Sequence, residues 1–310
     1  MRKWEDKNAG TTKDEQIKIE LEEQAALIRC ERKGNNAWHK FRRNKVAVVG
    51  LVIISIILFM GVFADFISPY DPNAFDILNM YAKPGTPGHL FGTDELGRDL
   101  LSRIIFGART SVVIAVGSTC LGGLIGILLG MIAGYIGGVL DSVLMRIMDG
   151  MSAFPYMILA VSIATILGPG EINVILALGI GVIPGFARTI RSEVLKLKHE
   201  ESCNAERVLG ASRSRILFRH ILPNALSPLI VYATLHVASA IISEAGLSFL
   251  GLGIVAPAAS WGNIIRSAQT CISTAPHIAV ISGAFILIAV VGFNLVGDGI
   301  RDVFDPKMKR

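Results

Sequence analysis

A few residues in this 310-residue sequence have types and spacing that could do chemistry, but none completes a catalytic motif. His199-Glu200-Glu201 begins like the HExxH zinc motif, yet Cys203 stands where its second histidine is needed. The sequence contains no GxxxxGK[ST] phosphate loop and no GxSxG nucleophile motif. Its four cysteines form no CxxC pair, so we expect apolar filler or free thiols. We therefore predict a protein that is no enzyme and has no cofactor or metal of its own.

The apolar residues predict a membrane protein instead. Hydrophobic residues make up 52% of the chain and charged residues 18%, and the mean hydropathy is +0.54. A bilayer span needs roughly 18–20 apolar residues, and several runs reach that length. We predict an all-α membrane protein with six transmembrane helices, and Pro155 is expected to kink the third. The runs cover residues 46–64, 111–138, 142–167, 172–190, 228–250 and 276–297.

The charges between these runs predict how the chain crosses the membrane. Lys and Arg concentrate in residues 34–45, 188–219 and 301–310, whereas the turn at 168–171 has neither. By the positive-inside rule, these basic segments and both termini lie in the cytoplasm, and residues 65–109 lie outside. We therefore expect a multi-pass protein of the cell membrane, in contact with lipid. Because the basic residues flank apolar runs, we expect no nucleic-acid partner.

Small and polar residues inside the runs predict how the helices pack. Gly122, Gly126, Gly130, Gly134 and Gly138 recur at every fourth position, which in a helix forms a stripe that allows close packing. Arg146 and Asp149 are expected to neutralise one another at i,i+3. Trp261 is expected to anchor the chain at the membrane interface.

Ionisable residues are scarce inside the apolar runs, and Glu244 is the clearest exception. Ion-coupled carriers place several acids or broken helices near the midplane, and channels need a charged ring or a filter loop. Energy for any transport should therefore come from elsewhere. Glu244 has two interpretations: it lines or gates the path and meets a peptide's amino group, or it bonds to neighbouring backbone or to a partner subunit.

The basic segment 203–223 has the features of a docking unit. Residues 203–209 favour a short helix that ends at Gly210, and Ser212 is a suitable N-cap for a second, basic helix that Pro223 is expected to stop. A short helix, a turn and a basic helix at the cytoplasmic surface are sized to fit a groove on a partner. The alternative is an ordinary basic loop that only fixes topology.

Segment 210–223 also resembles a known family. The spacing from Gly210 to Pro223 is similar to the "EAA" loop of ABC-importer permeases. Residues 219–224 (RHILPN) resemble the dipeptide/oligopeptide/nickel permeases in particular. Other segments agree in order: SPYDP at 68–72, FGTDELGRD at 91–99, EAGLSFLGLG at 244–253, SWGN at 260–263, NLVGDGIR at 294–301 and DP at 305–306. The resemblance covers about residues 38–310 and is to the second, C-type permease subunit.

This resemblance implies a type I ABC-importer permease fold. It also implies a heterodimer with a homologous permease subunit, two cytosolic ATPase subunits and an extracytoplasmic substrate-binding protein. The expected domains are a cytoplasmic tail (1–37), the first helix with its extracytoplasmic segment (38–110), the permease domain (111–300) and a cytoplasmic tail (301–310). The expected cargo is a di- or oligopeptide. Nickel or another small solute is the alternative within the family, and a non-ABC channel or carrier is the remote one.

Two groups of residues are candidate functional sites, and the resemblance assigns the first of them. The EAA loop couples the permease to its ATPases, here through Asn204, Ala205, Glu206, Arg207, Gly210, Ala211 and Pro223. The family usually has an acid at the position of Asn204, whereas this chain has one at Glu206, which alters the fine contacts with the ATPase. Four charged residues precede the second run, and they either contact the binding protein or form a local salt-bridged gate or fold element: Asp94, Glu95, Arg98 and Asp99.

Overall fold

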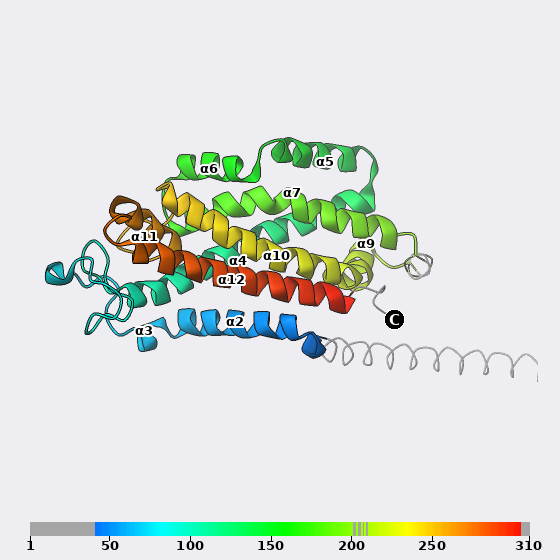
Figure 1. The fold of residues 1–310 in the computed structure, drawn as a ribbon. Helices are drawn as coiled ribbons and strands as arrows, with labels where there is room; N and C mark the ends of the chain where they lie inside the picture. The colour runs from blue at the N-terminus through cyan, green and yellow to red at the C-terminus, as the bar shows by residue number, and fades with distance from the viewer. Residues whose placement is uncertain (1–40, 201–202, 204–205, 207, 209, 305–310) are drawn as a thin grey trace, which may run out of the picture.

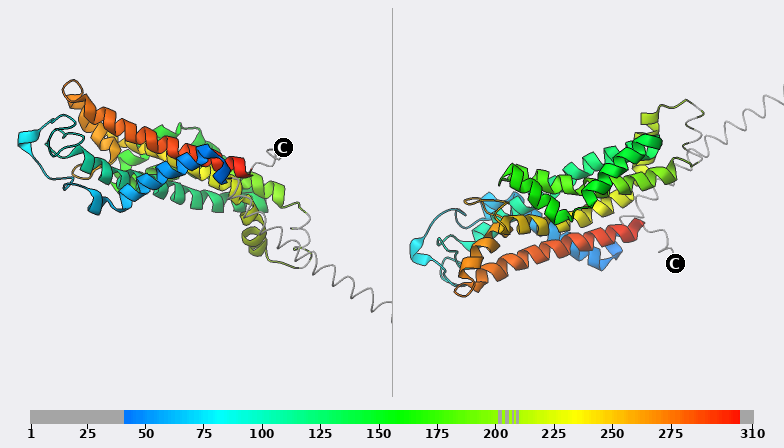
Figure 2. Two further views of the ribbon diagram at one scale, coloured as in Figure 1. Left: turned by 60° about the horizontal axis from the view of Figure 1, so that its bottom comes forward. Right: turned by 90° about the horizontal axis from the view of Figure 1, so that it is seen from above.

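The computed structural model describes residues 41–200, 203, 206, 208 and 210–304, and these form an elongated bundle of helices (Figures 1 and 2). The long helices are α2 (Lys45–Val62), α4 (Leu100–Ile136), α7 (Glu171–Leu197), α10 (Leu222–Phe249) and α12 (Pro276–Phe304). The shorter ones are α3 (Ala64–Ile67), η1 (Ile77–Asn79), α5 (Gly138–Ser152), α6 (Tyr156–Leu167), α9 (Arg213–Arg215), η2 (Ile216–Ile221), α11 (Trp261–Ala268) and η3 (Gln269–Cys271).

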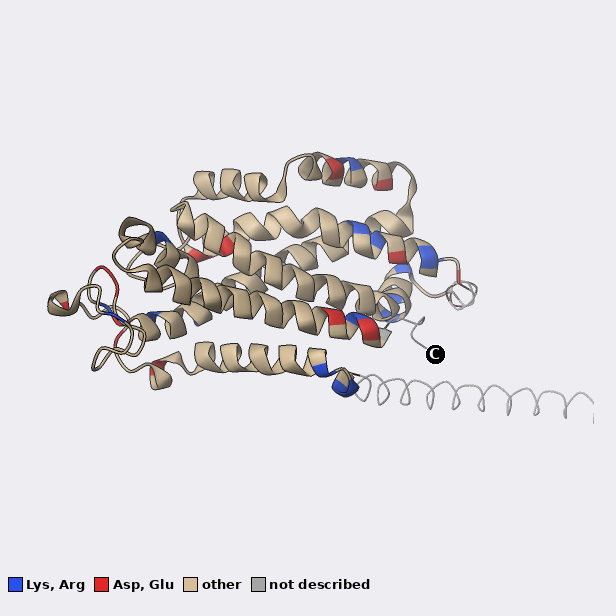
Figure 3. Cartoon of the chain, viewed as in Figure 1, with Lys and Arg blue, Asp and Glu red and all other residues tan. Residues whose placement is uncertain are grey.

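The two ends of this bundle differ in character. The loop end carries residues 68–99 and 250–275, and the basic end carries residues 41–45, 196–200 and 210–219 and the C-terminal end of α12. Charged residues gather mainly toward these ends and on α5, while the long middle stretches of α2, α10 and α12 have almost none (Figure 3).

Five helices in the described residues are long and apolar enough to cross a membrane. Helices α5 and α6 together would supply a sixth span, but they meet at a bend of 87°. Pro155 lies at this break as the N-cap of α6, because proline cannot continue the hydrogen-bond ladder of α5. The expected kink is confirmed, and it is large enough to make a broken span or a re-entrant loop.

The glycine stripe lies where α4 packs on α7, the helix pair with the most extensive contact in the described part of the chain. A Cβ at Gly126 would lie 2.6 Å from the Ile183 carbonyl oxygen, and one at Gly134 would lie 3.0 Å from Val194 Cβ. Gly122 and Gly130 are equally closed against α7. The predicted close packing is therefore confirmed at these four positions. It is wrong at Gly138, which has open space around it and begins α5 with φ +62°.

Helix α4 begins eleven residues before the predicted start of the second run. Asp99 caps its N-terminus by accepting a hydrogen bond from the Ser102 amide at 2.8 Å. The extra turns contain Arg103 and Arg109, and because these charged residues interrupt the apolar pattern, the sequence does not reveal the start of the helix. Arg103 is buried, and Arg109 reaches back to the Gly61 carbonyl and Asp65.

Trp261 is also placed differently from its prediction. Its side chain is fully buried, and its indole nitrogen donates a hydrogen bond to the Ile104 carbonyl at 3.1 Å. It therefore belongs to the core formed by α2, α4, α10 and α12, and the predicted role as an interface anchor is wrong.

Pro223 does not end a helix, as the sequence predicted. Helical structure runs without a break from Arg213 to Phe249. The stretch before the proline is π-helical, and the Leu222 amide donates to the Leu217 carbonyl five residues back. The Asn224 side chain donates to the His220 carbonyl at 2.7 Å. The wider turn and this side-chain hydrogen bond let the helix accommodate a residue that has no amide hydrogen.

Candidate functional site

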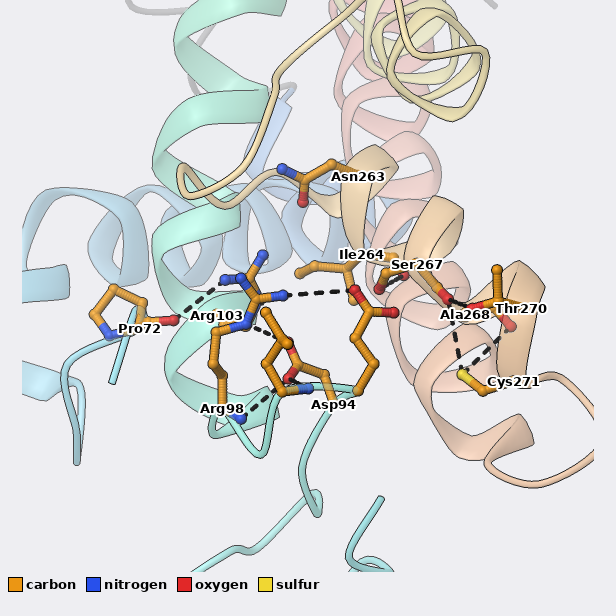
Figure 4. Close-up of polar contacts among 12 residues, drawn as sticks. Pro72, Asp94, Arg98, Arg103, Asn263, Ile264, Ser267, Ala268, Thr270 and Cys271 are labelled. Atoms are coloured by element: carbon orange, nitrogen blue, oxygen red, sulfur yellow. Dashed lines mark hydrogen bonds and ion pairs between the residues drawn. The ribbon is translucent and has the colours of Figure 1, made fainter. Parts of the chain in front are cut away.

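The charged motif at the loop end is built around Asp94. This carboxylate accepts hydrogen bonds from the Leu96 amide at 2.9 Å, the Arg98 amide at 3.0 Å and Arg98 Nε at 2.7 Å. Arg103 Nε lies 3.4 Å from the same carboxylate, and its Nη1 donates to the Pro72 carbonyl (Figure 4). Asp94, Arg98 and Arg103 are at most 3% exposed. One buried carboxylate thus joins the loop to the first turn of α4.

Two further predicted residues of this motif differ in how far they reach solvent. Asp99 is buried, caps α4 and lies 2.9 Å from His89 Nδ1. The Glu95 side chain is 30% exposed and lies 3.9 Å from Arg98 Nη2. Partial burial raises the pKa of Glu95, and the charge of Asp94 adds to this effect. Glu95 also lines a cavity of about 290 Å³ together with Arg98, Arg103 and Arg266. Of the four predicted contact residues, Glu95 is therefore the most accessible.

Glu244 lies fully buried on α10, away from this motif. Its carboxylate accepts hydrogen bonds from Ser111 Oγ at 3.0 Å and Ser248 Oγ at 2.8 Å. Ser111 also lies 3.4 Å from the Trp261 amide. The carboxylate thus connects α10 with α4 and, through Ser111, with α11. Glu244 is thus bonded to its neighbours, but through the side chains of Ser111 and Ser248 rather than through the backbone or a partner subunit, as the second interpretation expected.

The predicted coupling loop lies at the basic end. Gly210 has φ +80° and open space around it, and Ser212 caps α9 by accepting from the Arg215 amide at 3.4 Å. The Ala211 amide donates to the Glu206 carbonyl at 3.0 Å. Asn204, Ala205 and Arg207 lie outside the described residues. The turn and the start of the second helix are as predicted.

The acid that departs from the family pattern has a partner within the chain. Glu206 Oε1 lies 3.2 Å from His220 Nε2, and both side chains are about one-quarter exposed. His220 belongs to the π-helical turn that leads into α10. The displaced acid therefore connects position 206, before the Gly210 turn, to the π-helical turn that follows it.

A larger cavity, of about 460 Å³, lies among α5, α6, α7 and α10. Its lining includes Tyr156, Arg188, Tyr232 and His236, none of which the sequence analysis identified. The sequence did contain a signal for His236. It is an ionisable residue in the middle of an apolar run, the same feature that identified Glu244. Arg188 contacts Asp149 at 3.3 Å, so the predicted pairing of Asp149 with Arg146 is wrong.

The described part of the chain contains no group of three or more His, Cys, Asp or Glu side chains placed to hold a metal ion. It does contain two charged ends joined by long apolar helices. The charges of the loop end are mostly buried, and those of the basic end are partly exposed. A polar cavity lies beside the helices.

Comparison with known families agrees with this architecture. The family described as "Binding-protein-dependent transport system inner membrane component" matches residues 126–310. The "N-terminal TM domain of oligopeptide transport permease C" matches residues 34–84. The chain therefore belongs to the permease subunits of binding-protein-dependent ABC importers, and it is a multi-pass membrane protein.

Individual relatives narrow the comparison. The chain is 42% identical over 273 residues to "Glutathione transport system permease protein GsiD" of Escherichia coli O6:K15:H31 (strain 536 / UPEC), covering 88% of this chain and 90% of the relative. GsiD of Shigella boydii serotype 4 (strain Sb227) gives the same values.

A solved structure shares the fold. A chain from "Inward facing conformations of the MetNI methionine ABC transporter: CY5 SeMet soak crystal form" superposes with a TM-score of 0.53 at 21% identity. The match covers 66% of this chain and 97% of the other. The type I ABC-importer permease fold expected from the sequence is thereby confirmed.

Proposed function

We propose that this chain is one of two homologous permease subunits that form the path of an ATP-driven importer for di- or oligopeptides. The main support is the 42% identity, over most of both chains, to permeases named for glutathione, which is a tripeptide. The match of residues 34–84 to an oligopeptide permease points to the same cargo class. Nickel or another small solute is the alternative cargo, because the motifs of a permease sequence identify the type of transporter more directly than the solute it carries.

The proposed assembly includes two cytosolic ATPase subunits and an extracytoplasmic substrate-binding protein. ATP hydrolysis takes place on the ATPase subunits, and this chain has no nucleotide site of its own. The basic end and both termini lie in the cytoplasm, because Lys and Arg are retained on that side of a membrane. The loop end then faces the binding protein, and Glu95 is its most accessible charged candidate for that contact.

The loop from Asn204 to Ala211 is proposed to dock on an ATPase subunit. Its exposure supports this role: Val208 is 88% exposed although it is apolar, and Gly210 has no neighbour within 4 Å of an added Cβ. The open space around Gly210 leaves room for a partner to approach the turn. The helix from Arg213 to Phe249 carries any movement of this loop into the span.

A pair of glycine variants tests the coupling role. Gly210→Arg introduces a large, charged side chain on the proposed docking surface. Gly137→Arg is the matched control, because Gly137 also has positive φ (+72°) and open space, at the end of α4. Both should insert and assemble with the other permease. We expect Gly210→Arg to abolish ATP-driven uptake of trialanine into proteoliposomes, and Gly137→Arg to retain it.

Two outcomes would contradict the proposal in different ways. Uptake retained by Gly210→Arg would argue against the coupling role of the loop. Uptake by the unmodified assembly that does not depend on ATP would argue against the ABC importer and in favour of the remote alternative, a channel or carrier.

A further inference from the structure

The cavity among α5, α6, α7 and α10 has an unusual lining for a membrane-spanning region. It has a volume of about 460 Å³, and the polar residues and polar aromatic residues in its lining are Ser152, Tyr156, Arg188, Tyr232, His236 and Ser239. Gly181 and Arg188 lie about 15 and 25 Å along α7 from Glu171, so the cavity extends from mid-span toward the basic end. An arginine and a histidine facing lipid would be costly, so this wall must face protein or water.

The cavity is shaped by two glycines one turn apart on α7. A Cβ at Gly181 would lie 2.8 Å from Tyr156 Cε2, and a Cβ at Gly185 would overlap the Tyr232 hydroxyl. The two tyrosine rings therefore lie directly against the α7 backbone. Tyr156 meets the His236 ring edge-on, with centroids 5.8 Å apart. The aromatic wall thus consists of side chains from α6 and α10, and they pack on the face of α7 where Gly181 and Gly185 have no side chain.

His236 presents a hydrogen-bond acceptor in this wall when its ring is neutral. Thr119 Oγ1 donates to the Ala115 carbonyl at 2.7 Å, so its only hydrogen is committed. The 3.2 Å contact between Thr119 Oγ1 and His236 Nδ1 must then use the hydrogen on Nδ1. Nε2 is left with a lone pair. It can accept a hydrogen bond from an ammonium or an amide.

Arg188 supplies donors at the other end of the cavity. Its recorded contacts to the Met148 carbonyl, Asp149 and Ser152 all use Nη2. Nε and Nη1 have no recorded hydrogen bond among the described residues, and the side chain is 45% exposed. A guanidinium with free donors in a fork geometry matches a carboxylate.

We propose that this cavity binds the peptide in transit, with its C-terminal carboxylate on Arg188 and its amino end between Tyr156, Tyr232 and His236. The length fits: Gly181 and Arg188 are about 10 Å apart along α7, and an extended tripeptide spans about 10 Å. An ammonium group is attracted to tyrosine faces and to the His236 lone pair. The ligand class is a di- or tripeptide with a free carboxylate. This inference rests on the proposed function, because it assigns that function's cargo a site.

Protection of a cysteine in the cavity tests the site without requiring transport. Ser239→Cys places a thiol in the lining, at an exposed position, in a chain whose four native cysteines are replaced. The assembled importer in nanodiscs is labelled with a water-soluble maleimide in the presence of trialanine or trialanine amide. We expect trialanine to slow labelling, and the amide to need about a tenfold higher concentration, because it lacks the charge-assisted hydrogen bonds.

Variants of Arg188 then separate binding from structure. In Arg188→Gln, labelling without peptide should be unchanged, while trialanine should protect only as well as its amide. Arg188→Lys should restore part of the difference. Arg146→Gln is the matched control, since Arg146 lies on α5 but does not line the cavity, and it should keep the full difference.

Loss of protection overturns the inference in a way that is distinct from failure of the proposed function. If millimolar trialanine gave no protection, the cavity would not be a peptide site. The same conclusion would follow if trialanine still protected better than trialanine amide in Arg188→Gln. ATP-driven trialanine uptake, measured separately, would then still support the importer. If trialanine protected the thiol but was not taken up with ATP, the peptide site would be supported and the proposed function would be contradicted.

Discussion

The loop end and the basic end of this bundle are both rich in charge, but they use it in opposite ways. At the loop end, Asp94 is surrounded by Arg98 and Arg103, and all three are buried. At the basic end, Glu206 and His220 form a pair that is partly open to solvent, and Gly210 stands in open space. The first arrangement stabilises a fold, and the second leaves a surface available.

This difference shows that a charged motif recognised in a sequence can be a docking surface or an internal brace. Asp94, Arg98 and Asp99 looked as accessible in the sequence as Glu206. Burial separates them: each of the first three is at most 4% exposed. The following substitutions compare the two ends directly, in matched pairs.

The largest contrast should come from removing one acid at each end. Asp94→Asn leaves two buried guanidinium groups without their shared counter-charge, and breaking a buried pair costs about 3–5 kcal/mol. Glu206→Gln removes a partly exposed pair and should cost about 1 kcal/mol or less. Thermal unfolding of the detergent-purified chain measures both. Equal losses from the two variants would show that the loop end is not the more strongly braced.

The second contrast compares two glycines of similar backbone conformation. Gly97 (φ +73°) and Gly210 (φ +80°) share the left-handed strain that an alanine would meet, about 1–2 kcal/mol. At Gly97 the new methyl group would also overlap the Asp76 carbonyl oxygen, whereas Gly210 has open space. We expect Gly97→Ala to destabilise the chain by about 1–3 kcal/mol more than Gly210→Ala. A smaller loss at Gly97 would mean that residues 76–97 shift without cost.

The third contrast removes one helix cap at each end. Ser260 is fully buried and forms a capping box with Asn263 at the start of α11, with both hydrogen bonds at 3.2 Å. Ser212 is exposed, and its single capping hydrogen bond is 3.4 Å long. Ser260→Ala should cost about 1–2 kcal/mol, and Ser212→Ala only a few tenths. Denaturation midpoints of the two variants give the comparison.

The smallest expected effect is a pH dependence at Glu95. Burial raises the pKa of this carboxyl above its ordinary value of 4.5. Between the two values the folded chain binds more protons than the unfolded chain, so this group makes stability fall as pH rises. Lowering the pH from 7 toward 5 should therefore stabilise the wild type relative to Glu95→Gln. An opposite sign would place Glu95 in a favourable ion pair.

The sequence was sufficient to predict most of the fold. Five of the six apolar runs correspond to the long helices, and the glycines at 122, 126, 130 and 134 mark the α4–α7 contact. Errors arose where one residue was interpreted without its neighbours. Pro223 reads as a stop, but the π-helical turn before it and the Asn224 side chain let the helix continue. The charged first turns of α4 hid the start of this helix, where Arg103 has partners in the loop end and Arg109 has partners at residues 61–65.

The site could be predicted only in part. Gly210 and Ser212 have conformations that their residue types favour, so the turn of the proposed coupling loop followed from local rules. The burial of Asp94 and the cavity around Arg188 depend on contacts between distant segments, which spacing along the chain does not reveal. Tyr156, Arg188 and Tyr232 come from three separate helices, and nothing in their local sequence unites them.

The unbroken helix from Arg213 to Phe249 has a mechanical consequence. Its 37 residues make a rod about 55 Å long, with the Ser212 turn at one tip and Glu244 near the other. Tilting such a rod by about 5° about one tip moves the other by about 5 Å. Since the π-helical turn keeps the rod whole at Pro223, a small rotation beside the turn at Gly210 becomes a displacement comparable to one helical turn on the opposite side of the bilayer.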